Sequence, residues 1–200
     1  MDEERRVLTA KFELRKAADK PATLAGYAAK FNVRSEDLGG WVEEIKPGAF
    51  DKVLQAKPDT RALLNHDPNL VLGRTSSGTV RLSTDDVGLL AEIDLPDTQA
   101  ARDLAVSIGR GDIDQMSFGF RVAAGGALWD LDSDPAVRSV SEVAELLDVS
   151  VVTYPAYPQT EVGLRSLQEA RAAVLKPEPA PIERLRREIA SRDRGYEIQS

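Results

Sequence analysis

The sequence predicts a mainly β protein with a few helices around it, built as a barrel or a sandwich. Short segments that alternate apolar and polar residues recur along most of the chain, as in strands that bury one face. Helical spacing of apolar residues occurs in only a few places, and Gly, Pro, Asn and Asp separate the segments. Many short strands with few helices favour a barrel or sandwich with helices packed outside.

Most of the predicted strands lie in the first half of the chain. Alternation predicts one half-buried strand over residues 7–14 and another over 23–31, where Gly26 marks a bulge or a close backbone approach. The other predicted elements of this half are strands at 41–45, 61–66, 70–74, 78–84 and 88–95, and a short helix at 49–55. Asp85 and Asp86 link the last two strands as a hairpin turn.

The second half begins with a helix that Asp97 or Thr98 caps and that Gly109 and Gly111 end. Strands are predicted at 113–122, around 128–129, at 137–143 and at 146–154, the last of them β-branched and central in its sheet.

The composition changes after about Leu164. Helical spacing resumes at Arg165, residues 176–181 form a Pro-rich linker, and residues 182–189 predict a second, charged amphipathic helix. We therefore predict a main domain at 1–164 and a charged helical C-terminal extension at 165–200.

Composition excludes several classes of function. The 200 residues contain no cysteine and one histidine, which rules out disulfides, cysteine nucleophiles and thiolate metal sites, and we expect no metal or other cofactor. The net charge of −7 argues against binding to nucleic acid. No apolar run approaches the roughly 20 residues that span a bilayer, and no secretory signal is readable, so we expect no membrane contact and a cytosolic location.

The single histidine is the first candidate for chemistry. An apolar run leads to His66, and Asn65, Asp67 and Pro68 then break the strand. A scaffold presents working side chains in this way, at the end of a rigid element. Because imidazole exchanges protons near neutral pH, His66 is a candidate general base.

The second candidate is a serine in a strand with two distinct faces. Met116, Phe118 and Phe120 alternate with Ser117 and Gly119, so the apolar side anchors the strand while the other side presents a hydroxyl beside a glycine. A serine becomes a nucleophile when a neighbouring base takes its proton, and His66 is the one histidine that can do so.

An imidazole base also needs an acid to orient it. Asp148 is a candidate because it lies within an apolar run, where a charge is costly unless it is paired. Asp67 and Asp114 are alternatives by sequence proximity, although neither has an apolar setting.

Several motifs follow one another along the chain, namely Gly26-Tyr-Ala-Ala-Lys-Phe31, Glu44-Ile-Lys-Pro-Gly-Ala-Phe50, Leu64-Asn-His66-Asp-Pro, Leu72-Gly-Arg74, Met116-Ser117-Phe-Gly-Phe120 and Asp148-Val-Ser-Val-Val-Thr-Tyr-Pro-Ala156. In these motifs and their order, the chain resembles the prohead maturation proteases of tailed bacteriophages over about residues 20–165. The resemblance implies a closed seven-stranded β-barrel, similar to the herpesvirus assemblins, wrapped by helices.

The resemblance also implies an activity. Ser117 would be the nucleophile and His66 the base of a serine endopeptidase that cuts major capsid protein, scaffold or delta-domain segments, and itself, inside the assembling prohead in the host cytoplasm. The herpesvirus enzymes use a second histidine as third member, and this chain has none, so the role falls to an acid such as Asp148 or is missing. Arg138 or backbone N–H groups would supply the oxyanion hole, and the protein would associate with itself.

Two other functions are compatible with parts of this pattern. A catalytically inactive capsid-assembly or scaffold protein would keep the fold without the chemistry. A serine esterase is disfavoured because the Gly-x-Ser-x-Gly elbow of α/β-hydrolases is absent.

Overall fold

The computed structural model describes residues 3–9, 12–17, 20–154 and 161–175. Contacts divide the chain into two compact units, Met1–Ser166 and Leu167–Ser200. The first unit is mainly β with short helices, as the sequence predicts. The predicted Pro-rich linker and second C-terminal helix lie outside the described residues. No helix within the described ranges is long and apolar enough to cross a bilayer.

A five-stranded sheet carries the candidate residues, in the order β1-β9-β12-β5-β6. Its strands are β1 (Glu4–Thr9), β5 (Arg61–Leu64), β6 (Asp67–Arg74), β9 (Gln115–Val122) and β12 (Val143–Val152). The predicted central position of the β-branched strand is confirmed, because β12 lies between antiparallel β9 and parallel β5.

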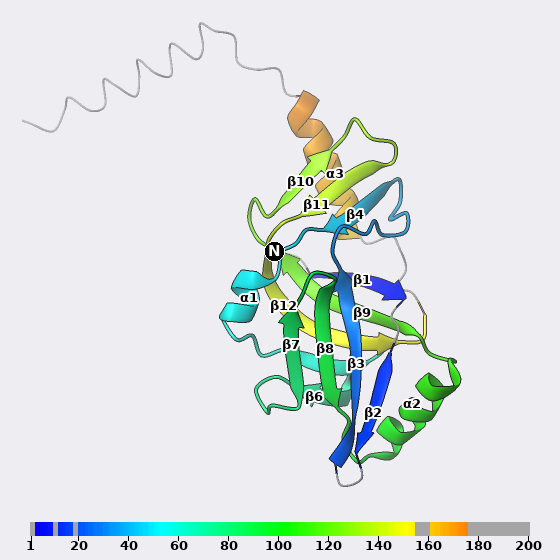
Figure 1. The fold of residues 1–200 in the computed structure, drawn as a ribbon. Coiled ribbons are helices and arrows are strands. Elements are labelled where there is room, and N and C mark those ends of the chain that lie inside the picture. Colours follow the sequence, from blue (N-terminus) through cyan, green and yellow to red (C-terminus); the bar gives the residue numbers. More distant parts are fainter. Residues whose placement is uncertain (1–2, 10–11, 18–19, 155–160, 176–200) are drawn as a thin grey trace, which may run out of the picture. The chain divides into compact units, whose positions relative to one another are not determined.

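A four-stranded antiparallel sheet packs against the first, in the order β2-β3-β8-β7. Its strands are β2 (Glu13–Ala17), β3 (Lys20–Lys30), β7 (Val80–Thr84) and β8 (Gly88–Asp94). The predicted hairpin between β7 and β8 is confirmed, and the Asp85 carboxylate accepts from the N–H groups of Val87 and Gly88 in the turn. Figure 1 shows β3, β7 and β8 crossing in front of β9 and β12.

The predicted single strand at 7–14 is wrong. Residues 4–9 pair with β9 as β1, whereas residues 13–17 pair with β3 as β2, in the other sheet. Both parts alternate in the same way, and no Gly or Pro separates them, so the pattern alone carries no sign that the chain changes partners.

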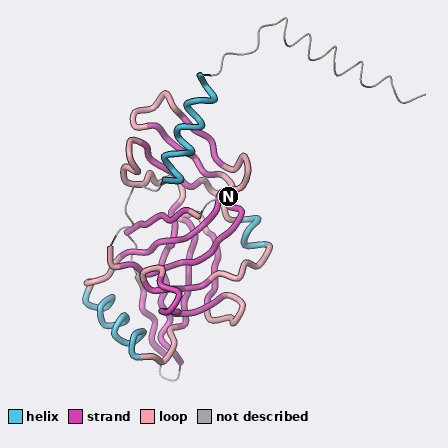
Figure 2. The backbone as a smooth tube through the Cα atoms, turned by 180° about the vertical axis from the view of Figure 1, so that it is seen from behind, coloured by secondary structure: helices cyan, strands magenta, loops and turns pink. Residues whose placement is uncertain are grey.

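A three-stranded sheet completes the β structure, in the order β10-β11-β4. Its strands are β4 (Trp41–Ile45), β10 (Ala127–Asp130) and β11 (Ala136–Val140). The helices are α1 (Asp51–Gln55), α2 (Gln99–Arg110) and α3 (Glu161–Leu175), and Figure 2 shows α1 and α2 beside the sheets from behind. Thr98 is the N-cap of α2 and accepts from the Ala101 N–H, and Gly111 ends the helix with a φ of 80°.

One hydrophobic core lies between the five- and four-stranded sheets. It combines Phe118 and Phe120 of β9 and Val149 of β12 with Leu89 and Ile93 of β8, all at most 2% exposed. The described strands pair in three separate sheets rather than in one closed ring, so the predicted seven-stranded barrel is not confirmed. The sheets share apolar side chains instead of a continuous hydrogen-bond ladder.

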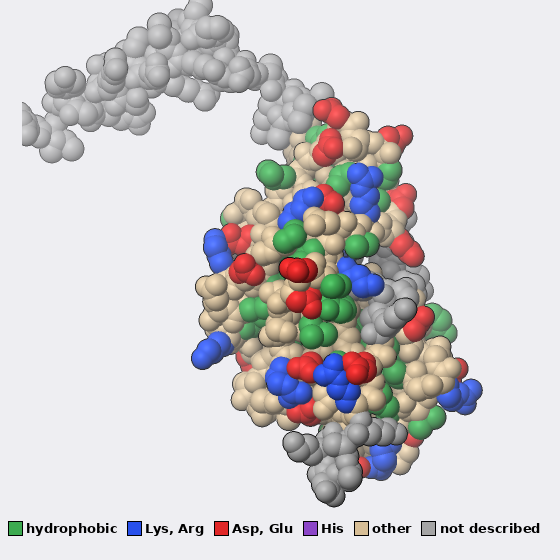
Figure 3. All heavy atoms as spheres, viewed as in Figure 1, with side chains coloured by type: hydrophobic (Ala, Val, Ile, Leu, Met, Phe, Trp, Pro, Cys, Tyr) green, Lys and Arg blue, Asp and Glu red, His purple; other side chains and the backbone are tan. Residues whose placement is uncertain are grey.

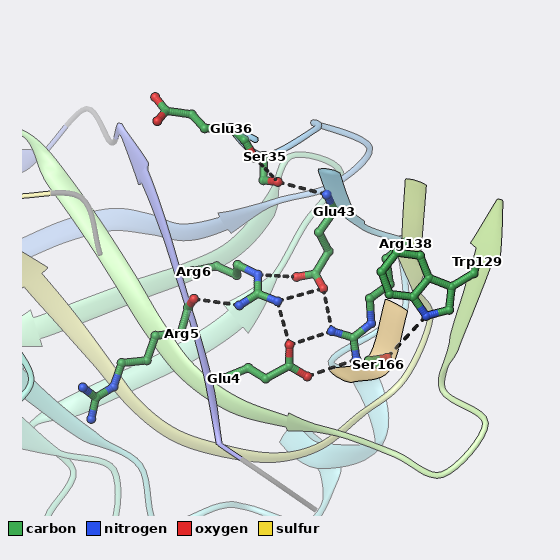
Figure 4. A network of polar contacts seen from close by, with 9 residues as sticks. All are labelled: Glu4, Arg5, Arg6, Ser35, Glu36, Glu43, Trp129, Arg138 and Ser166. Atoms are coloured by element: carbon green, nitrogen blue, oxygen red, sulfur yellow. Dashed lines mark hydrogen bonds and ion pairs between the residues drawn. The ribbon is translucent and has the colours of Figure 1, made fainter. Parts of the chain in front are cut away.

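Four charged side chains are buried where β1 meets the three-stranded sheet (Figure 4). Arg138 donates to Glu4 and Glu43, and Arg6 donates to the same two carboxylates, over distances of 2.6–3.1 Å. All four residues are at most 7% exposed, and both guanidinium groups lie about 6 Å from the Trp41 ring centre. We call these residues, Glu4, Arg6, Glu43 and Arg138, the charge cluster.

The outward face of the four-stranded sheet carries paired charges of both signs. Arg15 contacts Glu13 and Glu92, and Arg81 contacts Asp94. Figure 3 shows acidic and basic side chains side by side on the face of Figure 1. Such exposed pairs contribute little to stability.

Candidate active site

A two-residue turn between β5 and β6 presents His66. Asn65 and His66 form this turn, and both have a left-handed backbone, with φ values of 55° and 56°. Two positive φ values in succession are typical of the type I′ turns that join antiparallel strands tightly. The turn therefore holds the imidazole at the end of the sheet, as the sequence predicts.

Ser117 lies on β9, on the face opposite the core. Its neighbours Met116 and Phe118 are buried in the core, which fixes the strand, and Ser117 itself has no exposed surface. Ser117 pairs with Ser150 of β12 on one side and with Val7 of β1 on the other.

Asp148 lies on β12 beside a register shift. The pairing of β12 with β9 shifts between Leu146 and Asp148, and after the shift Asp148 lies opposite Gly119. Such irregularities re-aim side chains and are frequent near active sites. A Cβ at Gly119 would lie 2.5 Å from Asp148 Oδ2, so the carboxylate occupies space that only glycine leaves open.

The three side chains form one chain of hydrogen bonds, so the convergence predicted from the sequence is confirmed. His66 Nδ1 lies 2.7 Å from Asp148 Oδ1, and His66 Nε2 lies 2.7 Å from Ser117 Oγ. Because a carboxylate only accepts, the ring proton is on Nδ1, and Nε2 is left to accept from the serine hydroxyl. The side chains of His66 and Asp148 are each 8% exposed, so water weakens these bonds little.

The alternative acids are placed elsewhere. Asp67 Oδ1 accepts from the N–H and the side-chain amide of Asn69. Asp114 is exposed and precedes β9. Among the described residues, Asp148 is the acid that bonds to His66.

Ser150 is a further member of the site that the sequence argument missed. Its hydroxyl donates to Asp148 Oδ1 over 2.6 Å, and the residue is fully buried. The strand period contained the signal, because residues 148 and 150 share a face. This bond gives the buried carboxylate a second hydrogen-bond partner beside His66.

A groove of about 550 Å³ opens beside His66 and Asp148 on the outer face of the five-stranded sheet. Arg5, Arg61 and Arg121 line it, and they are paired with acids that also line it, namely Glu3, Asp59 and Glu145. The rim therefore offers charges of both signs to a ligand.

Arg138, proposed from the sequence for an oxyanion hole, is engaged elsewhere. Its Nη1 and Nη2 donate to Glu4 and Glu43 in the charge cluster. These donors are therefore not free to bind a developing oxyanion.

The arrangement of Ser117, His66 and Asp148 has the geometry of a Ser-His-Asp triad, the class of site that serine hydrolases use. A family model described as caudovirus prohead serine protease matches residues 10–173, and the chain belongs to this family.

Similar proteins come from two phages. The chain is 31% identical to the prohead protease of Enterobacteria phage HK97 over 147 residues. This match covers 72% of this chain and 60% of the HK97 protein. It thus spans about three fifths of that relative's length. The solved capsid assembly protease of bacteriophage T4 is similar with a TM-score of 0.46 and 11% identity, over 74% of this chain and 98% of that one.

Proposed function

We propose that this protein is a serine endopeptidase that cleaves capsid and scaffold protein, and itself, during maturation of a phage prohead. The observation that carries the proposal is the chain of two 2.7 Å contacts from Ser117 through His66 to Asp148. Membership of the prohead protease family supports the same activity.

The proposed reaction is acyl transfer. Ser117 Oγ attacks a peptide carbonyl carbon while His66 Nε2 takes the hydroxyl proton, which gives a tetrahedral oxyanion. The imidazolium then gives this proton to the leaving amine, and the C–N bond breaks. Water attacks the acyl carbon while His66 takes its proton, the bond from Ser117 Oγ to the acyl carbon breaks to release the acid, and the imidazolium returns the proton to Ser117 Oγ.

Asp148 has two roles in this proposal. By accepting from His66 Nδ1 it holds the tautomer in which Nε2 is unprotonated, and its charge stabilises the imidazolium formed during attack. Ser150 donates to the same oxygen and so acts as a positioning residue for the carboxylate.

The proposed substrates are extended segments of the major capsid protein and of scaffold or delta domains, cut inside the assembling prohead in the host cell. Ser117 has no exposed surface, so a substrate carbonyl reaches its hydroxyl only after neighbouring groups move aside. Residues 165–200 form the proposed C-terminal extension, either as a docking arm or as a tail that the enzyme removes, and we propose self-association during assembly.

The test compares wild type with Ser117→Ala and His66→Ala by intact mass spectrometry, each alone and with the cognate capsid precursor under assembly conditions. We expect defined fragments from wild type and none from the variants, because removing either residue lowers kcat by about 10⁶-fold in a well-studied serine protease. If all three proteins yield the same products, the chain is an assembly protein without catalysis.

Gly119→Ala should slow cleavage about 100-fold, because its Cβ would displace the Asp148 carboxylate and a shift near 1 Å at a catalytic group has an effect of that size. The measurement is the initial cleavage rate at matched folded fraction. Gly109→Ala in α2 is the control, since its Cβ meets nothing within 4 Å. Equal rates for wild type and Gly119→Ala would contradict the assigned role of Asp148.

A further inference from the structure

The turn that carries His66 has two successive residues in the left-handed backbone region. Asn65 and His66 both have φ values near 55°, in the left-handed region that residues other than Gly adopt rarely, although Asn and His do so more often than most. Such a conformation persists only where the surroundings hold it. Contacts of the turn with the rest of the sheet therefore bear directly on where the imidazole lies.

Asn65 supplies these contacts. Its N–H donates to the Val151 carbonyl over 2.8 Å. Its side-chain Oδ1 accepts from the Thr153 N–H over 2.9 Å and from the Thr153 hydroxyl over 3.2 Å. The turn is thus bound by its backbone to β12 and by the Asn65 side chain to Thr153, the residue that follows β12.

β12 also positions both hydrogen-bond partners of His66. Asp148 lies on β12 itself, and Ser117 pairs with Ser150 of β12 across the β9 ladder. A turn bound to β12 keeps the imidazole at a fixed distance from both partners. A turn released from Thr153 would keep the bond from the Asn65 N–H to Val151 but lose both side-chain contacts beyond it.

We propose that Asn65 is a positioning residue for the reaction, and that its Oδ1, bound to Thr153, sets the place of the His66 ring between Ser117 and Asp148. The inference rests on the proposed function, since it assigns a role within that same site. The hydrogen bonds of Asn65 go to Val151 and Thr153 and not to Ser117, so its effect passes through His66.

Two substitutions separate the side-chain contact from the turn conformation. Asn65→Gly keeps a residue that adopts positive φ but removes the acceptor, and we expect it to slow the reaction between about 10- and 100-fold. Asn65→Asp keeps both the tolerance of positive φ and an acceptor oxygen for Thr153, so it should restore most of the rate.

The readout is the rate at which an alkyl fluorophosphonate labels Ser117 in the full-length chain, followed by intact mass, with the melting temperature measured in parallel. Asn32→Gly is the matched control. Asn32 has a φ of 54° and its N–H donates to the Ile45 carbonyl over 2.9 Å, but its side chain makes no hydrogen bond to the described residues.

The expected pattern is slow labelling of Asn65→Gly, near-normal labelling of Asn65→Asp and Asn32→Gly, and similar melting temperatures. The inference is wrong if Asn65→Gly is labelled at the wild-type rate, if Asn65→Asp is as slow as Asn65→Gly, or if Asn32→Gly is equally slow. Wild type that shows no labelling dependent on Ser117 and His66 would instead overturn the proposed function.

Discussion

Asp148→Asn is expected to lower the cleavage rate about 10⁴-fold, the size of effect known for the same change in a Ser-His-Asp protease, while leaving the fold intact. The reason is that a carboxylate only accepts a hydrogen bond from His66, whereas an amide NH₂ donates one. Ser150 and His66 both contact Oδ1, so an amide NH₂ in that place would donate to His66 Nδ1 and the Ser150 hydroxyl would accept instead of donating. Nδ1 would then accept, Nε2 would carry the proton, and the imidazole could not take a proton from Ser117.

Asp67→Asn is the matched control for this prediction. Asp67 adjoins His66 in the sequence but accepts from Asn69 instead, so this variant should keep a rate within a few-fold of wild type. The measurement is the initial rate on a verified substrate, with circular dichroism to check the fold. A normal rate for Asp148→Asn, or an equal loss in Asp67→Asn, would remove Asp148 from the proposed mechanism.

Much of the site could be predicted because, at each of its three residues, the local sequence pattern and the chemistry of the side chain indicate the same role. Alternation placed Met116 and Phe118 in the core and Ser117 on the opposite face, and the structure confirms both placements. Asp148 was identified because a lone acid in an apolar run requires a partner. The histidine needed no choice, since the chain has one.

The contributions of Ser150 and Asn65 could not be predicted because they depend on pairing between distant segments. Asn65 and Thr153 are 88 residues apart, and only the parallel register of β5 with β12 brings them together. For the same reason the alternating pattern of residues 7–14 could not show that β1 and β2 belong to different sheets. Alternation specifies which face is buried but not which strand is the neighbour.

The charge cluster is the feature that the sequence concealed most fully. Glu4, Arg6, Glu43 and Arg138 come from β1, β4 and β11, and each alone resembles an ordinary surface charge. Their burial is tolerable because the two carboxylates and two guanidinium groups neutralise one another and share hydrogen bonds. The cluster therefore joins β1, the strand next to Ser117, to the three-stranded sheet.

Arg138→Leu should destabilise the protein by about 3–5 kcal/mol, because it leaves two buried carboxylates with only Arg6 between them. For a chain of this size the melting temperature should fall by roughly 6–20 °C. Arg15→Leu is the control, since Arg15 also contacts two glutamates but its side chain is 51% exposed, and such pairs contribute about 0–1 kcal/mol. Equal losses in the two variants would mean that burial of the cluster is not what makes it stabilising.

The same cluster predicts how stability depends on acid. Burial alone would raise the pKa of Glu4, but hydrogen bonds and charge from Arg138 and Arg6 hold that pKa below its ordinary value of 4.5. A carboxyl whose pKa is lower in the folded state stabilises the fold fully above the ordinary value and loses this contribution as pH falls through the folded-state value. The free energy of unfolding, measured by circular dichroism at a series of pH values, should therefore fall more steeply with decreasing pH below about pH 4.5 in wild type. In Arg138→Leu the slope should be shallower, because the main cause of the lowered pKa is gone, and an unchanged slope would place the acid sensitivity outside the cluster.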